Sequence, residues 1–345
     1  MLNHFRNTLG RSYCRLNHSR IGKKLQSWAA LAQKSAASVS DPSQGIIAGY
    51  EDILERRPNE DELLYWKPRI ESGLCHIDVF KETLHASYER EVKRANQTRE
   101  LVQLERFRMY IDRRDPDVGA PIRESKQYEP HVTSALLSVL AAGDTFLDIG
   151  ANIGYFSLLA ASVVGEMGKV ICFEPNVQNL RLLHASVLEN GFQHVQVFPL
   201  AASDSRHVLK LQSFGSNGFL VAAPSEPSNH QFVQSVAVDD LVSAEGRVHV
   251  IKMDIEGYES LALRGMRQLV ARYRPILFTE FNVWHLRHHG GIEPKFFLNE
   301  LINLGFLISA IGPLRTTNPS SDPASIMKLI RHDTDHVDLM AQPKE

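Results

Sequence analysis

The stretch 145–161, TFLDIGANIGYFSLLAA, constrains the fold of this chain more than any other part of the sequence. An apolar run that begins at Phe146 predicts a buried strand, and a helical spacing of apolar side chains resumes at Phe156. Two glycines, Gly150 and Gly154, lie between them and predict a tight turn. Strand, turn and helix in this order bring unpaired backbone N–H groups at the helix start close to a bound ligand.

The spacing of this turn separates two classes of ligand. Its pattern, D-x-G-x-x-x-G, differs from the dinucleotide fingerprint G-x-G-x-x-G because Asn152 and Tyr155 stand where that motif has small residues. A pyrophosphate is therefore disfavoured. An acid at the strand end suits a cationic ligand without phosphate, and S-adenosylmethionine carries a sulfonium and an ammonium. The expected cofactor-binding residues here are Asp148, Gly150, Asn152 and Gly154; the alternative is that the two glycines only form a turn.

A second apolar strand, KVICFEP at 169–175, ends in an acid. Glu174 follows Gly154 by twenty residues, the separation at which a βαβ unit places the carboxylate that accepts hydrogen bonds from a ribose diol. We therefore predict that Glu174 binds the ribose of the cofactor. The alternative is an acid at the start of the next helix, stabilised by the helix dipole.

Several motifs, in order, carry a resemblance to a known family. They are DIGANIGYFSLLAA, GKVICFEPN, VFPLAASD, VIKMDIEGYESLALRGM and PILFTEFN. Over most of residues 126–311 the chain resembles the FkbM family of S-adenosylmethionine-dependent methyltransferases, whose better understood members methylate hydroxyl groups of sugars or polyketides. The resemblance implies an α/β fold of the class I, Rossmann-like type, with a seven-stranded sheet whose last pair is antiparallel. It also implies S-adenosyl-L-methionine as the cofactor.

The same resemblance implies further cofactor contacts. The loop after the third strand lies against the adenine in this fold, which makes Ala202, Ser203 and Asp204 candidates for that contact. Family members carry a similar Tyr-Glu-Pro before the first strand, so Glu129 could reach the sulfonium or the acceptor. Asp204 and Glu129 also have simpler alternatives, as a turn cap and as an acid at a helix N-terminus.

Charged residues at the ends of the fourth and fifth strands are the catalytic candidates. Ligands of open α/β sheets bind at the carboxyl ends of strands, and alternation puts Lys252 and Asp254 on one face. We expect Asp254 or Glu256 to take the hydroxyl proton of the acceptor while Lys252 balances the charge. An ion pair that only stabilises the strand end is the alternative. Glu280 ends the fifth strand and completes an acidic edge suited to a cation.

Three histidines follow the fifth strand in WHLRHHGG. Imidazoles at this spacing could act as a base or bind a metal, and His285 is the first candidate for either role. A solvated loop is the favoured interpretation of this segment. We assign no metal ligand from the sequence.

Composition limits the other functions. The chain has 38 Lys and Arg against 40 Asp and Glu, a net charge of −2 that gives no general attraction for nucleic acid or anionic membrane. Three widely spaced cysteines favour a reducing compartment. No apolar run approaches the roughly 18 residues that a membrane span needs. We expect a cytoplasmic protein with no transmembrane segment.

The chain divides into unequal segments. Residues 1–40 hold seven Lys or Arg and no acid, as in a flexible arm, an organellar targeting peptide or a peripheral membrane contact. The segment around Trp66 predicts two or three short helices and resembles a small bacterial domain of unknown function fused to carbohydrate-assembly enzymes. The predicted segments are a basic arm (1–45), a helical domain (46–94), a linker (95–125), a methyltransferase domain (126–332) and a polar tail (333–345).

These patterns favour an O-methyltransferase that acts on a hydroxyl of a sugar, a glycan or a related small molecule. One alternative is a nucleic-acid methyltransferase, which is disfavoured because DIEG replaces the Asn/Asp-Pro-Pro-aromatic run that presents an extruded base and because no basic patch is visible. Another is a non-catalytic scaffold with a methyltransferase fold, in which residues 46–94 dock a partner.

Overall fold

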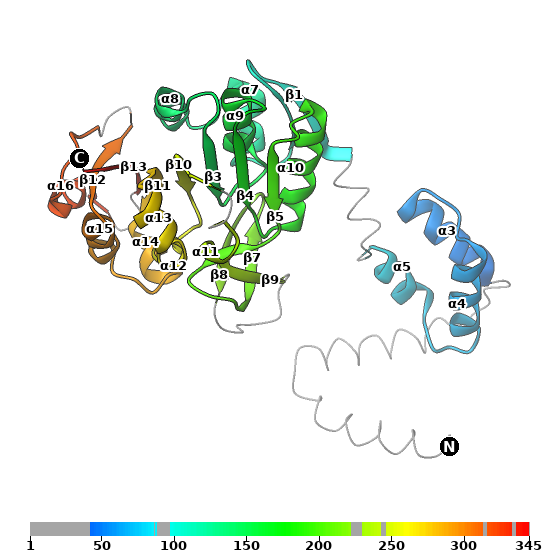
Figure 1. The fold of residues 1–345 in the computed structure, drawn as a ribbon. Coiled ribbons are helices and arrows are strands. Elements are labelled where there is room, and N and C mark those ends of the chain that lie inside the picture. The colour runs from blue at the N-terminus through cyan, green and yellow to red at the C-terminus, as the bar shows by residue number, and fades with distance from the viewer. Residues whose placement is uncertain are drawn as a thin grey trace, which may run out of the picture. The chain divides into compact units, whose positions relative to one another are not determined.

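The computed structural model of the protein describes residues 42–85, 87, 97–221, 230–242, 246–312, 316–332 and 336–344 (Figure 1). The chain forms two compact units, Met1–Gln97 and Thr98–Glu345. Most of the basic arm expected over 1–45 lies outside the described residues. Within the described ranges, no helix combines the length and the apolar character needed to cross a bilayer.

Three short helices make up the described part of the first unit. They are α3 (Pro42–Leu54), α4 (Glu60–Glu71) and α5 (Ile77–His85). Phe80 at the centre of the unit is fully buried, and Trp66 packs edge-on against it with ring centroids 5.0 Å apart. A capping box between Asn59 and Glu62 starts α4. The predicted helices around Trp66 are confirmed, with Trp66 in a packing role.

A seven-stranded sheet forms the middle of the second unit (Figure 1). Its order is β12 (Phe306–Ile311), β13 (His336–Pro343), β11 (Ile276–Asn282), β10 (Val250–Met253), β3 (Thr145–Ile149), β4 (Lys169–Phe173) and β5 (Val195–Phe198). The strands from β11 to β5 are parallel, and β13 is antiparallel to both of its neighbours. The predicted class I sheet with an antiparallel last pair is confirmed.

The last strand comes from an unexpected segment. From the sequence, the last strand is expected in the apolar segment SIMKLIR at 325–331, and 333–345 is expected to be a polar tail. In the structure, Pro323–Met327 forms helix α16 and the tail supplies β13. Val337 and Leu339 are buried and alternate with more exposed neighbours. This alternation is typical of a strand with one buried face, and its polar half makes the segment resemble a tail.

Helices cover both faces of the sheet because successive strand side chains point to opposite faces. Phe146 packs with one layer and Leu147 with the other. The first layer contains α7 (Gly119–Ser125), α8 (Pro130–Val139), α9 (Tyr155–Val164) and α10 (Val177–Asn190). The second contains α11 (Asp239–Val242), α12 (Glu259–Gly265), α13 (Arg267–Tyr273), α14 (Val283–His288) and α15 (Pro294–Asn303).

Two smaller sheets flank this core. β1 (Arg99–Gln103) and β2 (Arg108–Asp112) form an antiparallel hairpin whose buried Met109 and Ile111 join the first helical layer, in contrast to the linker expected over 95–125. The second small sheet has the order β6 (Ala201–Ser203), β9 (His230–Ala237), β7 (Val208–Phe214) and β8 (Asn217–Val221). The segment HVLKLQSFGSNGFL at 207–220 predicts an extra hairpin, and the antiparallel pair β7 and β8 confirms it.

Phe281 gives a test of the core. Its side chain is fully buried on β11, so Phe281→Ala should lower the free energy of unfolding by about 3 to 5 kcal/mol, through lost burial and the cavity left behind. Phe296 is 52% exposed on α15, and Phe296→Ala should cost less than about 1 kcal/mol. Urea unfolding of both variants measures the difference. Similar losses in the two variants would contradict this assignment of the core.

Candidate active site

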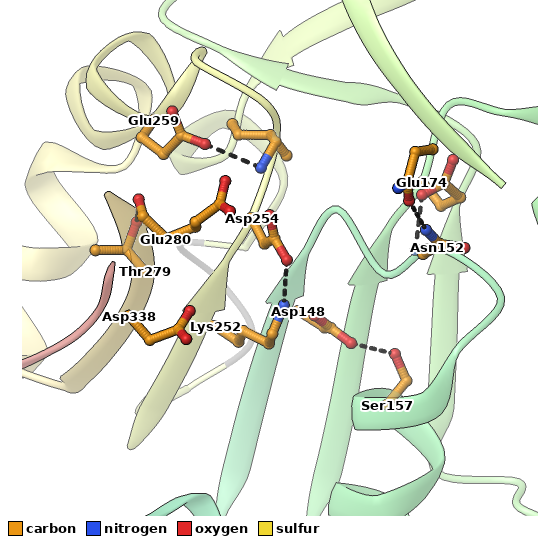
Figure 2. Close-up of polar contacts among 12 residues, drawn as sticks. Asp148, Asn152, Ser157, Glu174, Lys252, Asp254, Glu259, Thr279, Glu280 and Asp338 are labelled. Carbon is orange, nitrogen blue, oxygen red and sulfur yellow. Dashed lines mark hydrogen bonds and ion pairs between the residues drawn. The ribbon is translucent and has the colours of Figure 1, made fainter. Parts of the chain in front are cut away.

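A cleft with a volume of about 260 Å³ opens at the carboxyl ends of β3, β4 and β10. Its walls include the turn after β3, the loop after β10, the end of β11 and the β7–β8 hairpin. Figure 2 shows the polar side chains that gather here from separate strands. Nine residues predicted from the sequence line it: Glu129, Gly150, Asn152, Glu174, Ala202, Lys252, Asp254, Glu256 and Glu280.

The turn after β3 uses its N–H groups inside the protein. Gly150 and Ala151 both donate to the carbonyl of Phe173, at 2.9 and 3.0 Å, and the Asn152 N–H donates to Glu174 Oε2 at 2.8 Å. From the sequence, N–H groups in this turn are expected to face a ligand. In the structure, these three N–H groups already donate hydrogen bonds to acceptors within the protein. This bonding leaves them unable to cradle a pyrophosphate, in agreement with the missing dinucleotide fingerprint.

The two glycines of the turn have different roles. Gly150 has φ +84°, and a Cβ on it would meet the carbonyl oxygen of Asp254 and lie 2.7 Å from Ile255 Cγ2. Gly150 therefore lets β3 and the loop after β10 approach each other at the cleft. Gly154 has φ +96°, and a Cβ there would strike the side chain of Leu183 on α10. Gly154 thus serves helix packing and does not line the cleft.

Glu174 lies at the end of β4, where the ribose carboxylate is expected. Its side chain is buried and accepts hydrogen bonds from the N–H groups of Asn152 and Asn176, both at 2.8 Å (Figure 2). Burial raises the pKa of Glu174 to about 7, although these hydrogen bonds favour the charged form. Glu174 Oε1 also accepts from the Asn179 side-chain amide at 3.4 Å, whereas among the described residues Oε2 accepts only from Asn152. Oε2 therefore keeps a lone pair for a hydroxyl of a diol.

Buried Lys252 and half-buried Asp254 form an ion pair on the wall of the cleft, with Lys252 Nζ 2.9 Å from Asp254 Oδ2 (Figure 2). Lys252 Nζ also lies 4.6 Å from the centre of the Phe156 ring. Burial lowers the pKa of Lys252, but the carboxylates of Asp254, Glu129 and Asp148 outweigh burial and raise it. Lys252 therefore remains a cation among acids. The predicted sharing of one face by Lys252 and Asp254 is confirmed.

Three lining residues have left-handed backbones although none is glycine. The φ angles are 41° at Glu129, 52° at Asn152 and 55° at Glu256. Such conformations cost about 1 kcal/mol or more each and persist only where the surrounding structure holds them. Asn152 is held by its N–H bond to Glu174, and the carbonyl of Glu256 lies 2.8 Å from His289 Nδ1. Among the described residues, three other non-glycine residues with positive φ, Glu55, Lys126 and Arg274, do not line the cleft.

Glu256, Glu280 and His285 form a compact group at the edge of the cleft. One side-chain ligand atom from each lies within 4.8 Å of the others. His285 Nδ1 is 2.6 Å from Glu256 Oε2 and 3.9 Å from Glu280 Oε2. Burial raises the pKa of Glu280 well above its usual range, and the carboxylates of Asp254 and Glu256 add to the shift. His285 lies on α14 with a half-buried side chain, so the solvated loop expected here is wrong.

A comparison with known families bears on this site. A family model described as the methyltransferase FkbM domain matches residues 148–308, just under half of the chain. These residues contain the turn after β3, Glu174 and the charged ends of β10 and β11. The matched segment is similar to FkbM methyltransferase domains and is called the FkbM domain below.

Two of the solved structures similar to the chain are described as methyltransferases. An FkbM methyltransferase from Methylobacillus flagellatus matches 86% of this chain at 15% identity and a TM-score of 0.37, and this chain spans 58% of its length. An S-adenosylmethionine-dependent methyltransferase from Aquifex aeolicus matches 66% of this chain and 95% of its own, at 14% identity and a TM-score of 0.36. A search of curated proteins gave no significant match.

Some predicted residues of the FkbM domain lie outside the cleft lining. Asp148 is buried beneath α9, where its Oδ2 accepts from the Ser157 hydroxyl at 2.5 Å (Figure 2). Burial raises its pKa, and the Lys252 ammonium opposes the shift. Asp148 therefore acts on the cleft through its charge and the shape of the turn. The predicted residues absent from the lining are Asp148, Gly154, Ser203, Asp204 and His285.

Two asparagines that line the cleft, Asn176 and Asn179, were not predicted as site residues, whereas Asn217 stands in a segment that resembles a family loop near the acceptor. Asn176 and Asn179 follow Glu174, and Asn217 begins β8. Asn179 Nδ2 donates to the carbonyl of Ser216 at 2.7 Å, and Asn152 Nδ2 donates to Asn217 Oδ1 at 3.2 Å. These bonds fix the β7–β8 hairpin over the ribose position. The sequence shows the asparagines but gives no sign that hairpin and helix meet.

Gly150→Ala tests the close approach at the turn. Gly143 is a matched control because its φ of +86° is nearly that of Gly150, yet a Cβ there has nothing within 4 Å. Gly143→Ala should cost about 1 kcal/mol from backbone strain alone. Gly150→Ala adds a clash with the Asp254 carbonyl, so it should cost more and weaken S-adenosylmethionine binding. Denaturant unfolding and calorimetry measure both effects, and equal losses in the two variants would refute the clash.

The raised pKa of Glu174 predicts a pH dependence of stability. Its pKa is about 7 in the fold against 4.5 ordinarily, so the folded state holds a proton that the unfolded chain releases between these values. Its contribution to stability therefore falls as pH rises from about 4.5 to 7, by up to about 3 kcal/mol. In Glu174→Gln the loss of stability between pH 5 and 7 should be smaller than in the wild type. Exposed Glu166 is the control, and Glu166→Gln should leave the slope unchanged.

Proposed function

We propose that the protein is an S-adenosylmethionine-dependent O-methyltransferase whose acceptor is a hydroxyl of a sugar, a glycan or a related secondary metabolite. The observation that supports it most is the acidic wall of the cleft beside the cofactor position. Asp254, Glu256 and Glu280 all line this cleft, with Lys252 paired to Asp254 at 2.9 Å. Carboxylates are hydrogen-bond acceptors, which suits an acceptor rich in hydroxyl donors.

The residues that would hold the donor lie along one cleft. Glu174 would accept from the ribose diol, and Ala202, which lines the same cavity, would contact the adenine. Gly150 and Asp254 would lie beside the methionine end. The carboxylates of the acidic wall would favour a cationic sulfonium there.

The same charge argues against a nucleic-acid acceptor. A phosphate backbone placed at this wall would face several carboxylates. Lys252 carries the one ammonium among the described residues of the lining, and it is already paired with Asp254. Proteins that bind nucleic acid instead neutralise phosphates with Lys and Arg. A neutral polyol avoids this repulsion, so the cleft favours a carbohydrate-like acceptor.

The chemistry is a direct displacement. Most of the rate comes from holding the acceptor oxygen in line with the S–CH₃ bond. As the C–O bond forms and the S–C bond breaks, the hydroxyl proton passes to Asp254, the general base. Lys252 pairs with this carboxylate and fixes its orientation. The sulfur retains the electron pair of the broken bond and leaves as a thioether.

Asp254→Asn separates catalysis from donor binding. The amide is nearly isosteric but cannot take a proton, so methyl transfer should fall by about 10²- to 10⁴-fold. S-adenosylmethionine affinity, measured by calorimetry, should fall much less than the rate does, because the ribose contact at Glu174 remains and only one of the wall's carboxylates is lost. Asp240 is a surface residue near Arg206, and Asp240→Asn should retain full activity. An unchanged rate in Asp254→Asn would exclude this residue as the base.

Isotope transfer tests the acceptor class. The protein is incubated with S-adenosylmethionine that carries a labelled methyl group and with carbohydrate fractions, and the products are examined for a methyl-sized mass increase. We expect label on glycans or sugars and none on RNA or DNA. Label on nucleic acid alone would overturn the carbohydrate assignment. Glu174→Ala serves as the binding-deficient control, and it should bind the donor weakly by calorimetry and transfer no label.

A further inference from the structure

We infer that Glu256, Glu280 and His285 form a divalent cation site at the acceptor end of the cleft, and that this site selects acceptors with adjacent hydroxyl groups. The inference rests on the proposed function, because it concerns the acceptor side of the same cleft. Two carboxylates and one imidazole offer ligand atoms within 4.8 Å of one another. Oxygen and imidazole nitrogen together suit a first-row divalent ion such as Mn²⁺ or Zn²⁺.

The spacing fits one ion. Ligand distances of about 2.1 Å place adjacent ligand atoms about 3 Å apart and opposite ones about 4 Å apart. His285 Nδ1 lies 3.9 Å from Glu280 Oε2 and 2.6 Å from Glu256 Oε2. The first distance needs no change, and the second needs a shift of a few tenths of an ångström. Three protein ligands leave other positions open for two hydroxyl oxygens of the acceptor.

The imidazole nitrogen is placed for this role. His285 Nδ1 is buried and lies 2.6 Å from Glu256 Oε2, so the nitrogen and this carboxylate oxygen already face each other. A bound ion would take the place of a proton between them. The ring is fixed by stacking on His289, with centroids 5.0 Å apart, and His289 in turn stacks on Phe219 at 3.9 Å. Stacking holds the ring plane before any ion binds, which lowers the cost of ordering the site.

The backbone holds the other ligands equally firmly. Glu256 has a left-handed φ of 55°, and its carbonyl lies 2.8 Å from His289 Nδ1. At the next residue, Gly257, a Cβ would strike the carbonyl of His285, so the loop and α14 are in direct contact. Glu280 lies on β11, the strand that leads into α14 through Asn282, whose side chain caps that helix. Strand, loop and helix thus converge on one point.

Charge supplies the reason for a cation. Among the described residues, His285 is the single group capable of positive charge within 4 Å of the Glu256 and Glu280 carboxylates, and the nearby Lys252 is paired with Asp254. One imidazolium would neutralise one carboxylate of the two. A divalent ion with a neutral imidazole neutralises both and removes their repulsion.

A cation here would deepen the proposed chemistry. Adjacent hydroxyls of a sugar can both bind to one ion, which fixes the orientation of the acceptor ring. A bound hydroxyl also becomes more acidic, so its proton passes more easily to Asp254 as the methyl group arrives. The expected acceptor is therefore a 1,2-diol of a carbohydrate, and a lone alcohol should be a poor substitute.

Manganese binding to the full chain tests the inference. After treatment with a chelator, the protein is titrated with Mn²⁺ and free ion is followed by its paramagnetic resonance signal. We expect one ion per chain, with the affinity lowered at least about tenfold in Glu280→Gln and in His285→Ala. His288 is the matched control, since it lies on the same helix but outside the cluster, and His288→Ala should bind Mn²⁺ as the wild type does.

Further measurements make the result unambiguous. Thermal unfolding of the metal-free variants shows whether each remains folded, and a variant that does not fold is replaced by Glu256→Gln. Failure of the wild type to bind either Mn²⁺ or Zn²⁺, or equal affinity in all folded variants, overturns the metal site. Calorimetry with S-adenosylmethionine is run in parallel. Donor binding without metal binding would remove this inference alone, whereas loss of donor binding in the wild type would count against the proposed function.

Discussion

The buried ammonium of Lys252 is the charge on which the site depends. It lies where β3 and β10 pair in parallel register, with Lys252 opposite Asp148, and Asp254 follows at the end of β10. Acids on three different segments, Asp148, Glu129 and Asp254, keep it charged despite its burial. Removal of this cation would leave several buried carboxylates without compensation, which costs far more than an exposed ion pair contributes. The acidic cleft is therefore tied to the pairing of the central strands.

Backbone geometry also helps to fix the shape of the cleft. The turn after β3 uses its N–H groups to bind the end of β4, so Glu174 and Gly150 are fixed relative to each other without any ligand. Glu129, Asn152 and Glu256 hold conformations that non-glycine residues seldom adopt. Packing of the sheet beneath the cleft offsets the conformational energy of these residues, and the cleft is therefore rigid. A rigid cleft suits a reaction whose rate depends on alignment of two bound molecules.

The cleft also has two ends of different character. Near Glu174, asparagines tie the β7–β8 hairpin to the start of α10 through several hydrogen bonds. Near Glu280, the acids are crowded and the described residues offer few cations to balance them. The first end is therefore held rigid by neutral hydrogen bonds. The second end carries unbalanced negative charge, which favours cations and hydroxyl donors.

The sequence, through its motifs and the family they resemble, determined the fold class, the central strands that end at the site and nine of the residues that line the cleft. It could do so because glycine spacing, strand periodicity and the carboxyl-end rule for open α/β sheets act locally along the chain. Gly150, Glu174 and Asp254 are each readable in this way. The family resemblance of residues 148–308 extends the same local information to the donor.

Only the tertiary structure decided how distant segments meet. The last strand comes from 336–343, where a polar face hides the pattern, and His285 lies on a helix against Glu256 and Glu280 where a loop was expected. Asp148 points beneath α9, away from the cleft lining, because alternation along β3 fixes its side and packing decides what covers it. These outcomes depend on contacts between residues far apart in the chain, and such contacts leave no periodic trace in the sequence.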